Sequence, residues 1–253
     1  MTEHPIAVVG IGADGWAGLG EAARAAVLDA TTVVGSERQL ALLPATSATR
    51  RPLPSPLDPL IDELAARGDG VVCVLASGDP MLHGIGATLA RRIGPERLRV
   101  HPHASAFAIA CARLGWPAAE VELVSAVARP PDVVARVLQP GRRLIAYVTG
   151  TDGARTVARI LVDRGLGPSR LVVLERLGAP DERVTATTAS GSAATSIATA
   201  CNGSASASKP LAVVAVTRSS VAPRRSRTTR RLGPRPRSPR MRATVRAPSV
   251  PVT

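Results

Sequence analysis

Short apolar runs that lead into glycine-rich loops dominate the first half of the chain. Residues 6–9 form such a run before the turn at residues 10–15, and residues 71–75 lead into the loop at residues 76–86. Continuous apolar runs of this length are typical of strands buried on both faces of a parallel sheet. The same pattern predicts further strands at residues 31–34 and 98–100, and helices at residues 19–28, 57–67, 87–92 and 107–114.

The second half of the chain repeats this alternation. It predicts strands at residues 121–125, 144–148, 171–175 and 211–216, and helices at residues 131–138 and 154–164. Five prolines between Pro44 and Pro59 predict an irregular connection there. Alternating strands and helices indicate an α/β fold with ligand sites at the carboxyl ends of parallel strands. We therefore expect two α/β domains, at residues 1–115 and 116–217.

A segment rich in arginine ends the sequence. Residues 218–253 hold 11 arginines and no acidic residue, so they carry most of the formal net charge of +13 and leave +2 on residues 1–217. Arginine mixed with proline and serine offers little apolar surface for a packed core, which predicts a disordered basic tail. Such a tail is also typical of an adaptor that binds nucleic acid. We expect no nucleic-acid partner, because the charge is confined to the tail and only four residues are aromatic.

The apolar runs and the cysteines restrict the class of protein further. The longest runs, such as residues 71–76, are far shorter than the roughly 20 residues of a membrane span, and the start of the sequence lacks the charged segment of a signal peptide. Cys73, Cys111 and Cys201 have no paired spacing typical of a metal site or a disulfide framework. We expect a cytoplasmic protein with no membrane contact and no bound metal, in which Cys111 is buried.

The first loop carries a glycine pattern between a predicted strand and a predicted helix. Gly10-x-Gly12-x-x-Gly15 matches the dinucleotide-binding fingerprint, and Glu37 lies 22 residues after Gly15, near the position of a ribose-binding acid. This pattern alone favours a nicotinamide-dependent oxidoreductase. Glycines before a helix also let other anionic ligands approach the backbone, so the pattern does not identify the ligand.

The second loop is more specific. Ser77-Gly78-Asp79-Pro80 is followed by Gly84-Ile85-Gly86, which places two flexible backbone sites and one carboxylate at the end of a predicted strand. We expect Asp79 to cap the next helix, to face a cofactor, or both. Together with the first loop and the loop at residues 101–106, these motifs resemble the tetrapyrrole (corrin/porphyrin) methylase family over about residues 5–183.

Three further motifs, at residues 34–40, 110–115 and 175–183, are similar to those of the family branch that methylates precorrins in cobalamin biosynthesis. The resemblance implies an S-adenosyl-L-methionine-dependent C-methyltransferase that acts on a precorrin. It also implies a homodimer with a two-domain tetrapyrrole methylase-like fold, in which a cleft between the domains holds the cofactor chiefly through main-chain groups. The positions that match the family's cofactor contacts are Gly12, Ala13, Ser77, Gly78, Asp79, Leu82, Ser105, Ala106 and Thr149.

Two arginines lie beside the predicted strand ends. A macrocycle with several acetate and propionate groups requires fixed guanidinium partners. We therefore expect Arg38 and Arg129 to bind the substrate.

The chain departs from the family's pattern in all three loops. Ala13-Asp14 stands where the family usually has Pro-Gly, Leu82-His83 replaces an aromatic pair, and His103 replaces a glycine. Residues 125–129 lack the histidine of the Ser-x-His-x-Arg motif of relatives. Since this last departure removes an imidazole that handles protons, we assign no catalytic residue.

Overall fold

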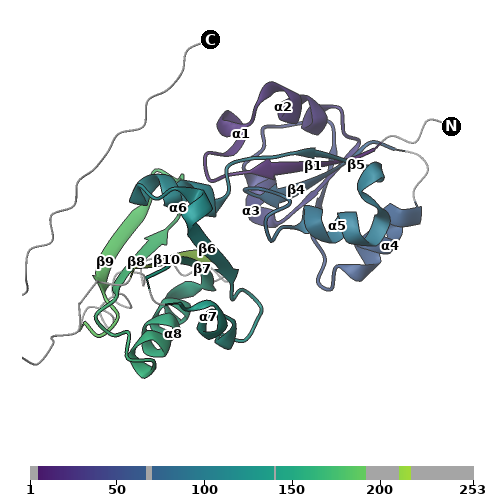
Figure 1. Cartoon of the computed structure of the whole chain (residues 1–253). Helices are drawn as coiled ribbons and strands as arrows, with labels where there is room; N and C mark the ends of the chain where they lie inside the picture. Colours follow the sequence, from purple (N-terminus) through teal and green to yellow (C-terminus); the bar gives the residue numbers. More distant parts are fainter. Residues whose placement is uncertain (1–4, 67–69, 140, 192–210, 218–253) are drawn as a thin grey trace, which may run out of the picture. The chain divides into compact units, whose positions relative to one another are not determined.

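The computed structural model describes residues 5–66, 70–139, 141–191 and 211–217. These residues form two five-stranded sheets with helices packed on them (Figure 1). The eight strands and six helices that the sequence pattern predicts are all present, and their ends differ from the expected ones by at most four residues. The prediction of an α/β fold is therefore confirmed.

The first sheet is parallel throughout, in the order β3-β2-β4-β1-β5. Successive side chains of β1 enter opposite layers, so that Val9 packs with Val27 in one layer and Val8 packs with Leu64 in the other. A strand covered on both faces must be apolar at every position, which explains the continuous runs. In Figure 1, α1 and α2 lie on one side of this sheet, and α4 and α5 lie on the other. The strands are β1 (Ile6–Ile11), β2 (Thr32–Gly35), β3 (Thr49–Pro52), β4 (Val72–Ser77) and β5 (Leu98–His101), and the helices are α1 (Gly15–Gly18), α2 (Glu21–Leu28), α3 (Glu37–Ala41), α4 (Asp58–Ala66) and α5 (Ile85–Ile93).

The second sheet is mixed, in the order β6-β7-β10-β8-β9. Strand β6 is parallel to β7, whereas β10 lies between β7 and β8 and runs antiparallel to both. Helices α7 and α8 pack on one face through residues such as Val134 and Leu161, and α6 packs on the other through Ala110 and Cys111. The burial of Cys111 is thus confirmed. The elements are β6 (Val121–Ser125), β7 (Arg143–Thr149), β8 (Arg170–Glu175), β9 (Arg183–Thr188), β10 (Leu211–Thr217), α6 (Ala106–Leu114), α7 (Asp132–Val137) and α8 (Gly150–Asp163).

Four elements of the fold were not expected from the pattern: the edge strands β3 and β9 and the short helices α1 and α3. The predicted irregular connection at residues 44–59 is wrong in part, because it contains the edge strand β3. Strand β9 is the edge of the second sheet, and α3 is a single short helix after β2. Edge strands show one or both faces to solvent and need no continuous apolar run, so their sequences give little signal.

The division into domains at residue 115 stays a prediction. Helix α6 precedes this point in the chain, and its buried face packs on the second sheet. The expected disordered tail at residues 218–253 lies outside the described residues, as does Cys201. Within the part of the chain that the structure describes, no helix is long and apolar enough to cross a membrane.

Cys73 lies at the centre of the first sheet, in β4, with no exposed surface. Burial raises the pKa of its thiol to about 12. We expect a brief pulse of iodoacetamide at pH 8 to leave Cys73 unmodified in the folded protein. The thiolate is the reactive form, and only about 1 in 10⁴ thiols is ionised four pH units below the pKa.

Peptide mass spectrometry measures this labelling, with the protein unfolded in concentrated urea as the control. Rapid alkylation of Cys73 in the native protein would show that β4 is less protected than its burial indicates.

Candidate functional site

Three loops meet at the carboxyl ends of β4, β1 and β5, which are neighbours in the first sheet. The amide of Gly78 donates a hydrogen bond to the carbonyl oxygen of Ile11 at 3.0 Å, which joins the second loop to the first. A β-carbon on Gly10 would overlap the carbonyl oxygen of Gly78 and lie 2.9 Å from the amide nitrogen of His103. The backbones of all three loops therefore approach closely where the sequence predicts a ligand site.

The first loop presents main chain rather than side chains. Gly12 and Ala13 are partly buried, and the amide of Gly15 donates to the carbonyl oxygen of Gly12 at 3.3 Å. A β-carbon on Gly12 would lie 2.5 Å from a carboxylate oxygen of Asp14 and 2.7 Å from Cε1 of His103. A side chain at residue 12 would therefore have to displace the side chains of Asp14 and His103.

Ser77 ends β4 and is held by α3. Its Oγ accepts hydrogen bonds from Gln39 Nε2 at 3.0 Å and from the Arg38 guanidinium at 3.4 Å. Gln39 is buried, and its amide oxygen accepts from the backbone amide of Ser36, which completes a capping box at the start of α3. The structure thus brings Arg38, an expected substrate ligand, beside Ser77, an expected cofactor contact.

Asp79 shapes the second loop and does not cap the next helix. Its carboxylate accepts from the backbone amide of Met81 at 2.8 Å, and its carbonyl oxygen accepts from the amide of Leu82 at 3.2 Å. The N-cap of α5 is Gly84, so the capping role expected for Asp79 is wrong. The physical reason is the turn at residues 79–84, which separates this carboxylate from the first amides of the helix.

The third loop contacts the second sheet through Tyr147. Ser105 is the N-cap of α6, and its buried hydroxyl accepts from the amide of Ala108 at 3.1 Å. The amide of Phe107 donates to the Tyr147 hydroxyl at 2.8 Å. Burial raises the pKa of Tyr147 to about 12, so this phenol stays protonated at neutral pH.

The second loop reaches the same tyrosine. The ring of His83 packs edge-on against the ring of Tyr147, with 6.1 Å between the ring centroids. Ala106 is the first residue of α6 and is partly exposed beside this contact region. Tyr147 therefore joins two loops of the first sheet to β7.

Thr149 and Arg129 lie at strand ends of the second sheet. Thr149 is exposed at the end of β7, two residues after Tyr147, and its side chain forms no capping bond to α8. The loop that carries Arg129 begins beside β7, because the amide of Ala126 donates to the carbonyl oxygen of Tyr147 at 2.9 Å. Among the residues that the structure describes, the exposed Arg129 guanidinium has no partner, and no contact joins it to Arg38.

Two residues that hold the site together, Gln39 and Tyr147, were not expected from the sequence pattern. Gln39 was detectable, because Ser36-x-x-Gln39 is a capping-box pattern. The capping box fixes the glutamine side chain, whose amide nitrogen then bonds to Ser77. Tyr147 is the only tyrosine of the chain and stands in a predicted buried strand, where its hydroxyl requires a partner.

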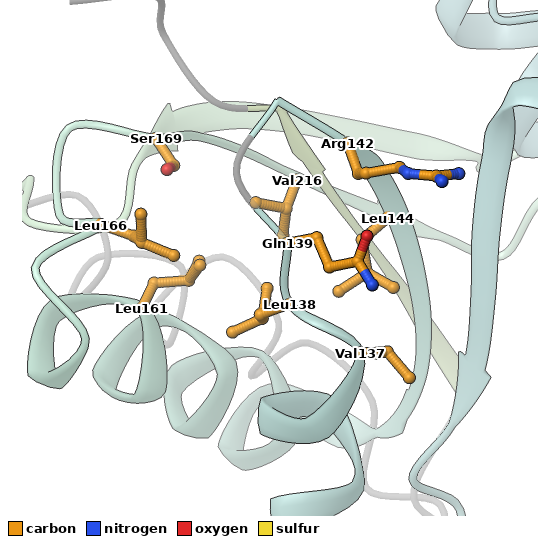
Figure 2. A pocket seen from close by; sticks show the side chains of 9 residues that line it. All are labelled: Val137, Leu138, Gln139, Arg142, Leu144, Leu161, Leu166, Ser169 and Val216. Carbon is orange, nitrogen blue, oxygen red and sulfur yellow. The ribbon is translucent and has the colours of Figure 1, made fainter.

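A depression separate from the three loops lies at the end of the second sheet opposite to Thr149 (Figure 2). It is bordered by the start of β7 at Leu144, the end of β10 at Val216 and the residue before β8, Ser169. Thr149 pairs with Leu211 and Leu144 with Val216, so this depression is about five residues, or roughly 16 Å, from the Thr149 end. Its aliphatic lining is therefore distinct from the site at the three loops. In the described residues, no cluster of three or more His, Cys, Asp or Glu side chains is placed to hold a metal ion.

Comparison of the sequence with known proteins identifies relatives over most of its length. The family model described as Tetrapyrrole (Corrin/Porphyrin) Methylases matches residues 5–192. The chain is 43% identical over 182 residues to a precorrin-6Y C(5,15)-methyltransferase [decarboxylating] from Sinorhizobium sp, a match that covers 71% of this chain and 44% of that protein. It is 36% identical over 180 residues to a cobalt-precorrin-7 C(5)-methyltransferase from Salmonella typhimurium, a match that covers 71% of this chain and 88% of that protein. The chain thus spans less than half the length of the first of these relatives.

Solved structures share the fold. A precorrin-6Y methylase from Archaeoglobus fulgidus superposes with a TM-score of 0.59 at 23% identity, covering 85% of this chain and 99% of that one. A uroporphyrin-III C-methyltransferase from Thermus thermophilus, in complex with S-adenosylhomocysteine, superposes with a TM-score of 0.58 at 19% identity, covering 83% and 96%. The family match and the shared fold lead to one conclusion: the chain belongs to the tetrapyrrole (corrin/porphyrin) methylase family.

Proposed function

We propose that this chain is an S-adenosyl-L-methionine-dependent C-methyltransferase that acts on a precorrin in cobalamin biosynthesis. The observation that carries the proposal is the 43% identity over 182 residues to a precorrin-6Y methyltransferase. The family model matches residues 5–192, which include the three converging loops. The similar cobalt-precorrin-7 methyltransferase is matched over 88% of its length, which supports the same class of substrate.

The residues at the three loops fit the cofactor. Gly12, Ala13, Gly78 and Ala106 have no side chain or only a methyl group, so their main chain is open to a ligand at the sheet edge. Gly78 has φ +62°, a left-handed conformation that favours glycine. We propose cofactor contacts from these residues and from Ser77, Asp79, Leu82, Ser105 and Thr149.

The chemistry requires positioning more than a reactive side chain. S-Adenosyl-L-methionine supplies a methyl group that is already activated on a sulfonium, so the protein need not provide a covalent nucleophile. The residues of the loops align the two reactants and exclude water, which lowers the barrier by several kcal/mol, on the order of 7 for well-oriented reactants. Arg38, held at Ser77, and Arg129, whose guanidinium has no partner among the described residues, are proposed to bind substrate carboxylates.

The alternative of a nicotinamide-dependent oxidoreductase has no support from the relatives or the solved structures. Glu37, the acid expected to bind ribose in that case, is exposed in the first turn of α3. Gly10 is explained by the close approach of the second and third loops, and Gly15 by its left-handed φ of +62°.

Ligand binding by the full chain tests the proposal. We expect S-adenosylhomocysteine to raise the melting temperature, since a ligand at 100 times its Kd stabilises the folded state by about 2.7 kcal/mol. NADH and a short oligonucleotide at the same concentration are the controls and should leave it unchanged. Stabilisation by NADH alone would overturn the assignment in favour of the oxidoreductase. The expected homodimer stays a prediction, which sedimentation velocity measures.

A further inference from the structure

The side chains of His103 and Asp14 join the third loop to the first. Nε2 of His103 lies 3.3 Å from Oδ2 of Asp14. The imidazole is largely buried, with 13% of its side chain exposed, whereas the carboxylate is 42% exposed. Asp14 is the N-cap residue of α1 but makes no capping hydrogen bond, so its carboxylate is free to bind the imidazole.

Both ring nitrogens of His103 face oxygen acceptors. Nδ1 lies 3.3 Å from the carbonyl oxygen of Ala104, on the opposite side of the ring from Asp14. A neutral imidazole has one N–H and satisfies only one of these acceptors, whereas the doubly protonated ring donates to both. With a hydrogen on Nε2, the ring donates to the carboxylate of Asp14, and a hydrogen bond to a carboxylate is stronger than one between neutral groups.

The pair lies directly against the backbone of the first loop. The carboxylate of Asp14 and Cε1 of His103 both border the α-carbon of Gly12, at 2.5 Å and 2.7 Å from the position of a β-carbon there. His103 also precedes Ser105 by two residues. A change in the pair would thus displace proposed cofactor contacts in two loops at once.

The sheet itself does not hold these two loops together. The ladder between β1 and β5 ends at the pair Val9–His101, where the two loops begin. Neither His103 nor Asp14 belongs to the buried apolar layers of the first sheet. The separation of the loops beyond the ladder therefore depends on contacts such as the one between His103 and Asp14.

We propose that His103 and Asp14 are positioning residues, which hold the first and third loops at the separation that cofactor binding requires. This inference rests on the proposed function, since it takes the three loops as the cofactor site. It assigns a purpose to Asp14 and His103, two of the positions where the chain departs from the family's pattern.

Calorimetry with S-adenosylhomocysteine on the full chain tests the pair. We expect His103→Gln and Asp14→Asn each to weaken binding about tenfold, and the double variant to bind no more weakly than either single variant, because each change breaks the same interaction. The exchange variant, Asp14→His with His103→Asp, should recover part of the lost affinity. The matched control is Arg92→Gln, which breaks an exposed ion pair with Asp58 between α4 and α5 and should leave the affinity unchanged.

Single variants that bind like the parent, or losses that add in the double variant, would overturn the positioning role while the proposed function stands. If the parent itself does not bind S-adenosylhomocysteine, the proposed function fails, and this inference fails with it. Melting temperatures, measured for every variant without ligand, separate the two roles. If each variant's loss of affinity is matched by an equal loss of folding stability that the exchange variant does not restore, the pair is structural only.

Discussion

Gly10→Ser is expected to destabilise the folded protein by about 3 kcal/mol, at the upper end of the usual cost of overpacking. The added β-carbon would overlap the carbonyl oxygen of Gly78 and lie 2.9 Å from the amide nitrogen of His103. Both obstacles are backbone atoms and cannot rotate away. The register of β1 on β4, in which Gly10 pairs with Ala76, prevents β1 from moving to relieve the overlap.

Urea denaturation, followed by circular dichroism, measures the free energy of unfolding. The matched control is Gly20→Ser, because a β-carbon at Gly20 meets no atom within 4 Å and serine is favoured at this N-cap of α2. We expect this control to unfold within about 1 kcal/mol of the parent. Equal stability of the two variants would show that the three loops do not approach as closely as the structure indicates.

Gly78→Val is expected to abolish binding of S-adenosylhomocysteine, by at least about 100-fold, while the protein stays folded. Gly78 has φ +62°, which a β-branched residue adopts only with strain of about 1–2 kcal/mol. Its β-carbon would also lie 3.2 Å from both the carbonyl oxygen of Ala104 and the α-carbon of Ser105. The second loop must then shift away from the third, and the proposed cofactor contacts separate.

Calorimetry at a temperature below the melting of every variant measures this loss. Gly165→Val is the matched control, since Gly165 has a similar φ of +69° but no atom within 4 Å of an added β-carbon, in the loop after α8. Gly165→Val should introduce similar backbone strain and leave the affinity for S-adenosylhomocysteine unchanged. If Gly78→Val binds the ligand like the parent, the assignment of the second loop to the cofactor is wrong.

The edge elements show where sequence patterns lose their information. Strand β3 has the sequence Thr49-Arg50-Arg51-Pro52, and most of its residues are exposed. It is specified by its pairing with β2, from Thr32–Thr49 to Gly35–Pro52, and not by burial of its own side chains. Strand β9 is similar, because its side chains alternate between exposed and half-buried positions along β8.

The candidate site was predictable to the level of loops but not of contacts. Glycines and small residues after predicted parallel strands were sufficient to indicate where Gly12, Gly78 and Ser105 gather. The side chains that support these loops could not be predicted in this way. Gln39 bonds to Ser77, which is 38 residues away along the chain, and Tyr147 bonds to Phe107, which is 40 residues away. Such contacts depend on packing between layers.

The sequence by itself determined the buried strands, the helices between them and the family, because continuous apolar runs and glycine-rich turns are local properties of the chain. Only the tertiary structure decided that β10 inserts antiparallel between β7 and β8, since an apolar run has no direction. It also decided that α6 covers the second sheet, and that Asp79 bonds within its own turn while Asp14 pairs with His103. Asp14 and His103 are far apart in the chain, and they become neighbours only because the first sheet places β1 beside β5.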